Sequence, residues 1–398
     1  EPLPKMQWFI RMTAEPHAKN QKSKIKNQNS GGSLRDLAVE AVKSGKIKFI
    51  PKRFEKIFFH WMKNLKDWNI SRQIAWGIRI PAWYNKNSKL KTQNSKLESE
   101  GEIYFGAEPP DSEGWEQDLD VFDTWFSSGQ WPFATLMTSR GSKSLPVRQA
   151  GKVKDQKSKS DFDKFYPTDV METGWDILFF WVARMMMLGL YRTGKVPFRI
   201  VYLHGLVRDK DRQKMSKSKG NVIDPLGVAE TYGTDAVRVA LIAGTAPGND
   251  PVISEDKIRG YRNFINKIWN ISRFIALQGS RPGKVVRFIG SDAKLIGEFD
   301  ILSKKVTRFC KDFQFHRAFE LLYHYTWHTF ADKIIEQAKP RLTSLSKEER
   351  EQSFALLYII YMNLLKLLHP FIPFVTEYIW REVFKKESLL MVEEWPKV

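Results

Sequence analysis

A short run of lysines and serines could hold a highly charged anion. The stretch 211–220 is DRQKMSKSKG, and its candidate groups are Lys214, Ser216, Lys217, Ser218 and Lys219. Ammonium and hydroxyl groups on a mobile loop are suited to bind a polyphosphate. Solvated linkers have the same composition, and similar runs occur at 19–30, 85–100 and 152–161.

The surrounding elements favour chemistry for this run over a linker. The stretch FRIVYLHG at 198–205 is continuously apolar up to its end, which predicts a buried strand of a parallel sheet. Ligands of open α/β sheets bind just past the carboxyl ends of such strands. After the loop, Asp224 as N-cap, Pro225 and a terminal Gly233 predict a short helix. The three similar runs follow no such strand.

The remaining pattern predicts an α/β region followed by an all-α bundle. Short β-rich runs lie at 7–12, 46–51 and 78–84, and the apolar run 174–190 predicts a buried helix. From residue 261 onward, apolar residues recur every three or four positions, as in packed helices. We therefore expect the α/β region to end near 245, with a connector at 246–260 and a helical domain at 261–398.

Charge and cysteine content narrow the class of protein. The 398 residues carry a formal charge of +19, which favours a polyanionic partner. More than half of that charge lies in aromatic-free stretches at 17–33, 85–100 and 138–161, which we expect to be disordered insertions. The single cysteine, Cys310, excludes a disulfide framework and fits a cytoplasmic protein. The run 174–190 is shorter than the roughly 20 residues of a membrane span, so no membrane association is expected.

Several ordered blocks resemble the class I aminoacyl-tRNA synthetases, and within them the valyl-tRNA synthetases. The run KMSKS at 214–218 stands between HGLVRD and KGNVIDP, like the second signature of that class. The other matching blocks are DWNISRQIAWGIRIPAWY at 67–84, DVFDTWFSSGQWPFATL at 120–136, FYPTDVMETGWDILFFWVARMMMLGL at 165–190 and NFINKIWNISRF at 263–274. The resemblance implies the second half of a Rossmann-like catalytic domain, followed by an anticodon-binding helical bundle.

The resemblance also implies roles for individual residues. Lys214 and Lys217 would stabilise the phosphates of ATP, which enters with Mg²⁺, as pyrophosphate leaves. The other ATP contacts would come from Gly174, Asp176, His204, Gly205, Met215, Ser216 and Ser218. The valine side chain would lie among Trp125, Ile177 and Trp181. Without the resemblance, the two tryptophans are more simply core residues and Asp176 a charge at a helix N-terminus.

Other features of that family do not occur in the sequence. No His-x-Gly-His signature is present, and the opening residues resemble the return from an inserted editing domain, so residues 1–45 are expected to be that return segment. We therefore expect the C-terminal part of a synthetase, inactive alone and possibly completed by a separate N-terminal half. The Cys pairs of a zinc knuckle are also missing, so no zinc is predicted.

The implied reaction is the ATP-dependent joining of valine to tRNA(Val). An isoleucyl-tRNA synthetase fragment is a close alternative, although the block ETGWDILFFW favours valine. A noncatalytic tRNA-binding protein derived from a synthetase is the alternative from another class. On the aromatic helix after 261, Arg262, Asn263, Lys267 and Arg273 face either RNA or solvent, and the sequence leaves both possibilities open.

Overall fold

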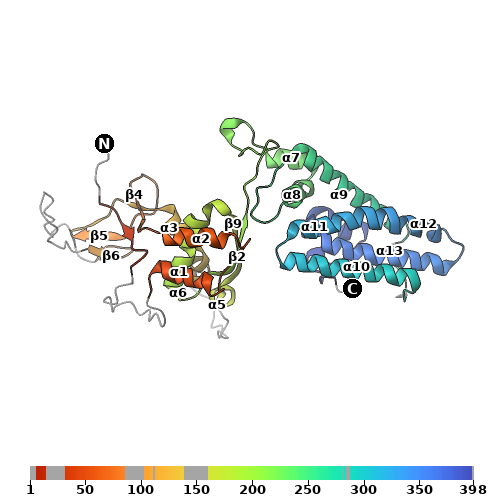
Figure 1. Ribbon diagram of the computed structural model, residues 1–398, viewed down its shortest axis with the longest axis horizontal. Coiled ribbons are helices and arrows are strands. Elements are labelled where there is room, and N and C mark those ends of the chain that lie inside the picture. Colours follow the sequence, from red (N-terminus) through yellow and green to blue (C-terminus); the bar gives the residue numbers. More distant parts are fainter. Residues whose placement is uncertain are drawn as a thin grey trace, which may run out of the picture. The chain divides into compact units, whose positions relative to one another are not determined.

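The computed structural model describes residues 6–14, 32–85, 103–110, 113–138, 160–279, 281–283 and 287–396. It divides into two compact units, Glu1–Leu203 and His204–Val398, and Figure 1 labels many of their elements. Most of the three expected insertions lie outside the described residues. Two predicted bounds are wrong by a residue or more, because Ser33 is the buried N-cap of a helix and Asn85 is the last residue of a strand.

The first unit is a mixture of short strands and helices. Its strands are β1 (Phe9–Ile10), β2 (Lys48–Ile50), β3 (Trp68–Asn69), β4 (Ser71–Arg72), β5 (Ala82–Asn85), β6 (Ile103–Phe105), β7 (Trp115–Gln117), β8 (Val121–Phe122), β9 (Thr168–Gly174) and β10 (Phe198–His204). Its helices are α1 (Leu34–Lys43), α2 (Phe54–Lys63), α3 (Thr124–Ser128), α4 (Trp131–Thr138), α5 (Asp161–Phe165) and α6 (Arg184–Thr193).

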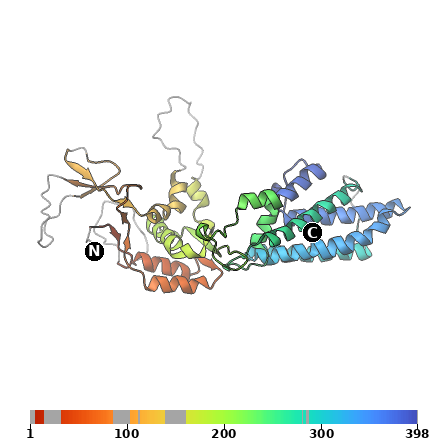
Figure 2. The ribbon, with the colours of Figure 1, turned by 90° about the horizontal axis from the view of Figure 1, so that it is seen from above.

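A three-stranded sheet of order β2-β10-β9 forms the centre of this unit. Strand β10 pairs in parallel with β2, and Val201 stands opposite Phe49. Both Val201 and Leu203 are fully buried, which confirms the buried parallel strand predicted over 198–205. Helix α1 packs against α2 and α6 (Figure 2). The same core contains residues of all three helices.

The helix expected over 174–190 begins differently. Strand β9 continues to Gly174, a 3₁₀ turn covers Trp175–Ile177, and a π-helical segment covers Leu178–Ala183 before α6 begins. The run is helical, but its first turns are not α-helical. An apolar run has no polar face to mark its period, so the sequence could not distinguish these turns. Such π-helical segments are frequent at functional sites.

The second unit contains the expected helical domain. Its helices are α7 (Pro225–Tyr232), α8 (Thr234–Ile242), α9 (Glu255–Ala276), α10 (Gly290–Lys311), α11 (Phe315–His324), α12 (Glu336–Leu342), α13 (Lys347–Leu368) and α14 (Pro373–Tyr378), with π-helical segments at Tyr325–Ile335 and Ile379–Val383. Helices α10, α11 and α13 run alongside one another (Figure 1).

Helix α13 is the centre of this bundle. It is buried on most of its circumference, as expected of a helix surrounded by others. The fully buried Tyr361 donates a hydrogen bond of 2.8 Å from its hydroxyl to the carbonyl of Ile268 on α9. Burial raises the pKa of this phenol, so the hydroxyl keeps its proton and remains a donor.

The boundaries of two helices test the sequence patterns. Asp224 caps α7 by accepting from the amides of Leu226 and Gly227, as predicted. Helix α9 begins at Glu255 behind the N-cap Ser254, inside the range expected to be a connector. Its first turn is mostly charged and only Ile258 in it is buried, so the apolar period did not reveal the start. Every helix within the described ranges is too short or too polar to span a membrane.

Candidate functional site

Gly205 begins the signature loop, which we define as residues 205–221. A Cβ atom on Gly205 would lie 2.1 Å from the carbonyl oxygen of Asn249. Only glycine permits this close approach of two backbone segments. The next amide, that of Leu206, donates to Oδ1 of Asp250 at 2.8 Å. The loop therefore starts in direct contact with the segment that precedes α9.

An ion pair holds the same junction. Arg208 places its Nη2 2.6 Å and its Nε 2.7 Å from Oδ2 of Asp250. Its backbone also pairs with Val252 on one side and with Lys214 on the other. A charged pair with two short hydrogen bonds fixes direction as well as distance. Sequence reasoning did not single out Arg208 or Asp250, although Arg208 lies within the HGLVRD block.

Asp209 and Asn221 close the loop. Oδ1 of Asp209 accepts from the amides of Asp211 at 3.0 Å and Gln213 at 2.7 Å, while Oδ2 accepts from Nδ2 of Asn221 at 2.7 Å. The hydrogen bond from Asn221 is the main reason that the pKa of Asp209 is lowered. Oδ1 of Asn221 in turn accepts from the amide of Ser216 at 2.9 Å. The backbone of the signature is therefore held from within.

The predicted signature residues lie on this framework. The side chain of Lys214 is exposed, and among the described residues no carboxylate forms an ion pair with it. Met215 packs against a small apolar cluster that includes Ala236 and Ile253. The hydroxyls of Ser216 and Ser218 lie 3.2 Å apart. Lys217 begins a 3₁₀ turn.

His204 stands at the carboxyl end of β10, with its side chain exposed. Together with Gly205 it joins the buried strand directly to the loop. The structure therefore places His204, Gly205 and residues 214–218 on one continuous segment. The roles that the family resemblance implies for them stay predictions.

The first unit holds the other predicted residues around α3. Asp123 is the N-cap of α3, and its Oδ1 accepts from the amide of Trp125 at 3.2 Å. Trp125 lies against Phe180, with ring centroids 6.3 Å apart. Nε1 of Trp181 donates to the carbonyl of Ser128 at 3.1 Å. Trp125 and Trp181 thus stand on two elements that are bonded to each other.

The remaining residues of that set lie just before the π-helical segment. Gly174 is buried at the end of β9, while Asp176 and Ile177 belong to the 3₁₀ turn that follows. The side chain of Asp176 is exposed and that of Ile177 is half-buried. The assignment of these residues to ATP and valine stays a prediction.

A buried charge network supports Trp125. The carboxylate of Asp123 is buried and accepts from Nε1 of Trp68 at 2.9 Å. It also lies 3.1 Å from Nη2 of Arg72 and 3.5 Å from Nη1 of Arg184. The guanidinium of Arg184 lies 4.0 Å from the centroid of the Trp68 ring. Burial lowers the pKa of Arg184 to about 10, although Asp123 opposes this shift.

The sequence contains two local signals for this network. Asp123 directly precedes a helix, which is a capping position. Arg184 is a charge within an apolar run, and a charge in that setting requires a partner. What the sequence could not indicate is that these two residues, together with Arg72, belong to one cluster.

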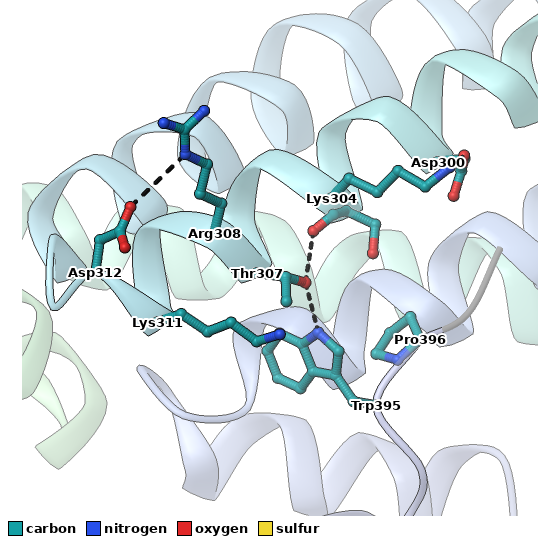
Figure 3. Close-up of a pocket in the computed structure, with 9 residues that line it drawn as sticks. Asp300, Lys304, Thr307, Arg308, Lys311, Asp312, Trp395 and Pro396 are labelled. Atoms are coloured by element: carbon teal, nitrogen blue, oxygen red, sulfur yellow. Dashed lines mark hydrogen bonds and ion pairs between the residues drawn. The ribbon is translucent and has the colours of Figure 1, made fainter.

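Hollows in the second unit lie away from the predicted site residues. One of about 630 Å³ runs along α10 and is lined by residues that include Lys304, Arg308, Lys311 and Trp395 (Figure 3). Nε1 of Trp395 donates to Oγ1 of Thr307 at 2.7 Å. Lys304 and Arg308 are paired with Asp300 and Asp312. None of the predicted site residues lines this hollow.

Metal ligands do not cluster in the part of the chain that the structure describes. No group of three or more His, Cys, Asp or Glu side chains there is arranged to hold an ion. The expectation that the protein needs no zinc stays a prediction.

Two family models match the chain. Residues 1–254 match "tRNA synthetases class I (I, L, M and V)", and residues 292–398 match "Anticodon-binding domain of tRNA ligase". Both the predicted fold class and the order of the two parts are thereby confirmed.

The chain is also similar along its whole length to curated valine--tRNA ligases. Identity is 38% to that of Clostridium acetobutylicum, 39% to that of Bacillus subtilis strain 168 and 40% to that of Geobacillus kaustophilus. In each case all of this chain is covered, but only 41% of the relative. The resemblance to valyl-tRNA synthetases is confirmed.

Solved structures show the same fold at lower identity. LeuRS of Agrobacterium radiobacter K84, in a ternary complex with tRNA and LeuAMS, superposes with a TM-score of 0.63 at 21% identity, over 86% of this chain and 45% of that one. Methionyl-tRNA synthetase of Mycobacterium tuberculosis bound by methionyl-adenylate gives 0.62 at 20% identity, over 87% and 60%.

Proposed function

Because this chain belongs to the class I tRNA synthetases of the I, L, M and V group, we propose that it forms part of a valine--tRNA ligase. The complete enzyme would join valine to ATP as valyl-adenylate, releasing pyrophosphate, and then transfer the valyl group to tRNA(Val). Identity of 38% to 40% with valine--tRNA ligases over the whole chain supports valine as the substrate.

The signature loop is the observation that carries this proposal. Hydrogen bonds around Asp209 and Asn221 shape the loop, yet they leave the ammonium of Lys214 exposed and without a carboxylate partner in the described residues. Lys214 and Lys217 would stabilise the negative charge that develops as pyrophosphate leaves. Phosphoryl and adenylyl transfers depend on such electrostatic stabilisation and need no protein nucleophile.

Seven further residues would contact ATP. His204, Gly205, Met215, Ser216 and Ser218 would serve from the signature loop and its start. Gly174 and Asp176 would serve from the end of β9. Mg²⁺ would accompany the triphosphate as part of the substrate and neutralise its charge.

The valine side chain would lie among Trp125, Trp181 and Ile177. The indole of Trp181 is held by its hydrogen bond to Ser128, and that of Trp125 lies against Phe180. Side chains fixed in this way would exclude a larger amino-acid side chain by volume. They cannot strongly reject threonine, which has nearly the same shape, a limit that valyl-tRNA synthetases themselves illustrate. We therefore propose that the complete enzyme relies on hydrolytic editing outside this chain.

The chain spans 41% of the length of the curated relatives it matches, and it contains no His-x-Gly-His signature. We propose that the chain alone is inactive and that a separate polypeptide with the first half of the nucleotide-binding fold can complete it. In that reading the chain contributes the second half of the catalytic site and the anticodon-binding domain.

Valine-dependent exchange of pyrophosphate into ATP tests this proposal. We expect no exchange from the chain alone and measurable exchange after addition of the first-half polypeptide of a Bacillus relative. The variant Lys217→Ala should lower the restored rate by about 100-fold, whereas Lys219→Ala, in the same turn, should change it by less than about threefold. Exchange by the chain alone, or equal effects of both variants, would refute the assignment.

The same assay separates the alternatives. Exchange with isoleucine but not valine would identify an isoleucyl enzyme. Binding of tRNA without restored exchange under any pairing would favour a noncatalytic tRNA-binding protein.

A further inference from the structure

Helix α8 lies between two hydrophobic cores. Ala236 and Ala240 belong to the small cluster on which Met215 of the signature loop packs. Val239 on the same helix belongs to the main core of the helical bundle. One short helix therefore contributes both to the cluster on which Met215 packs and to the core of the bundle that follows.

The N-terminal end of α8 is bonded to the last helices of the bundle. Asp235 is only 5% exposed. Its carboxylate oxygens accept from the amide of Phe374 at 3.3 Å and from the amide of Val375 at 2.7 Å, in the first turn of α14. The residues are 139 and 140 positions apart in the chain. Burial raises the pKa of this carboxyl, whereas the hydrogen bonds from the two amides lower it. The amides therefore stabilise the charged form of Asp235.

Arg238 makes a second connection one turn later on α8. Its Nε donates to the carbonyl of Phe371 at 3.3 Å and its Nη2 to that of Pro370 at 3.2 Å. The guanidinium thus satisfies two backbone carbonyls in the turn that follows α13. We call Asp235 and Arg238, with the turn 370–375 that they bind, the α8 clasp.

We propose that Asp235 and Arg238 are positioning residues for the signature loop. They hold α8 against the bundle, and α8 in turn holds Met215 and the backbone around it. The structural part of this proposal is independent of the proposed function, and only the predicted effect on catalysis rests on it. Without the clasp, the loop would keep its internal hydrogen bonds and its bonds to Asp250 but lose the support of α8 beneath Met215.

Asp292 provides a matched control. It is also buried, at 6% exposure, and its two oxygens each lie 2.8 Å from a guanidinium nitrogen of Arg341. It joins α10 to α12 and makes none of these bonds with α8. Asp235→Asn and Asp292→Asn therefore make the same chemical change at comparable burial, and only the first affects the clasp.

Hydrogen exchange of the full chain, without substrates, tests the proposal. In Asp235→Asn, the amides of Leu206 and Ser216 should exchange about tenfold faster, while amides in the middle of α13 keep their rates. Arg238→Gln should act in the same direction with a smaller effect. Asp292→Asn should leave the loop rates within about twofold of the parent.

Unchanged loop exchange in Asp235→Asn and Arg238→Gln would overturn the proposal, as would an equal acceleration in Asp292→Asn. If Asp235→Asn does not fold, Arg238→Gln decides the question alone. In an enzyme completed by the first-half polypeptide, Asp235→Asn should lower kcat for valine-dependent pyrophosphate exchange about tenfold, with an unchanged KM for valine. If only the pyrophosphate-exchange assay fails, the proposed function is refuted, but the hydrogen-exchange result for the loop still stands.

Discussion

Oδ2 of Asp209 accepts a hydrogen bond of 2.7 Å from the side-chain amide of Asn221, at the opposite end of the signature loop. The side-chain oxygen Oδ1 of Asn221 accepts a hydrogen bond from the backbone amide of Ser216. A single asparagine therefore ties Asp209 to the centre of the loop, and the exposed side chain of Lys214 extends from a backbone that is held in place.

Replacement of Asn221 by alanine should open the loop. Both bonds are lost together, so we expect trypsin to cleave next to Lys214 about tenfold faster than in the parent, because local opening controls proteolysis. Limited proteolysis with mass spectrometry measures this rate. Asn263→Ala, at an exposed position of α9, is the control and should leave the rate unchanged; equal cleavage of all three proteins would contradict the prediction.

Two glycine substitutions should have opposite effects on stability. Gly205→Ala forces a Cβ atom against Asn249, and we expect the free energy of unfolding of the second unit to fall by about 1–3 kcal/mol. Gly260→Ala places a methyl group in open space within α9, and should raise it by about 0.5–1 kcal/mol. Urea titration measures both, and a stabilised Gly205→Ala variant would show that the close approach is not rigid.

Removal of the Asp123 carboxylate should destabilise the first unit strongly. In Asp123→Ala the largely buried Arg184 loses its partner, which typically costs about 3–5 kcal/mol. Arg72→Ala removes the more exposed partner of the same carboxylate and should cost about 1 kcal/mol or less. Denaturant titration followed by tryptophan fluorescence compares them, and similar losses would mean that Arg184 is not held by Asp123.

The helical unit should lose stability below neutral pH because of His369. Its Nδ1 lies 2.8 Å from Oγ1 of Thr376. Burial lowers its pKa, against the opposing effects of Glu377 and Asp235. The folded state therefore binds its proton less readily than the unfolded state, so stability falls as pH falls through the ordinary histidine range.

We expect the urea midpoint of the parent to fall more between pH 7.5 and 5.5 than that of His369→Asn. Asp235 has a raised pKa and acts in the opposite direction, since its ionisation with rising pH removes stability. Comparing parent and variant at each pH isolates the contribution of His369 to the pH dependence of stability. His60→Asn, in the first unit, should retain the full pH dependence of the parent, and a parent that is no more sensitive than His369→Asn would contradict the assignment.

Much of the chain could be predicted from local pattern. The apolar stretch before His204 predicted the parallel strand β10, and Asp224, Pro225 and Gly233 predicted α7. Helix α9 was predicted too late because its first turn is charged, and the π-helical segment after Ile177 has no period that would reveal it. Both errors have one cause: a hydrophobic period exists only where one face is buried and the other is not.

The sequence by itself determined the order of elements, the position of the signature loop after a buried strand, and the family, because each depends on residues close together in the chain. Only the tertiary structure decided how that loop is supported. The contacts of Gly205 with Asn249, Arg208 with Asp250 and Asp235 with Val375 join residues that no local pattern relates. Their partners are set by how the helices and loops pack, and that packing depends on the whole second unit at once.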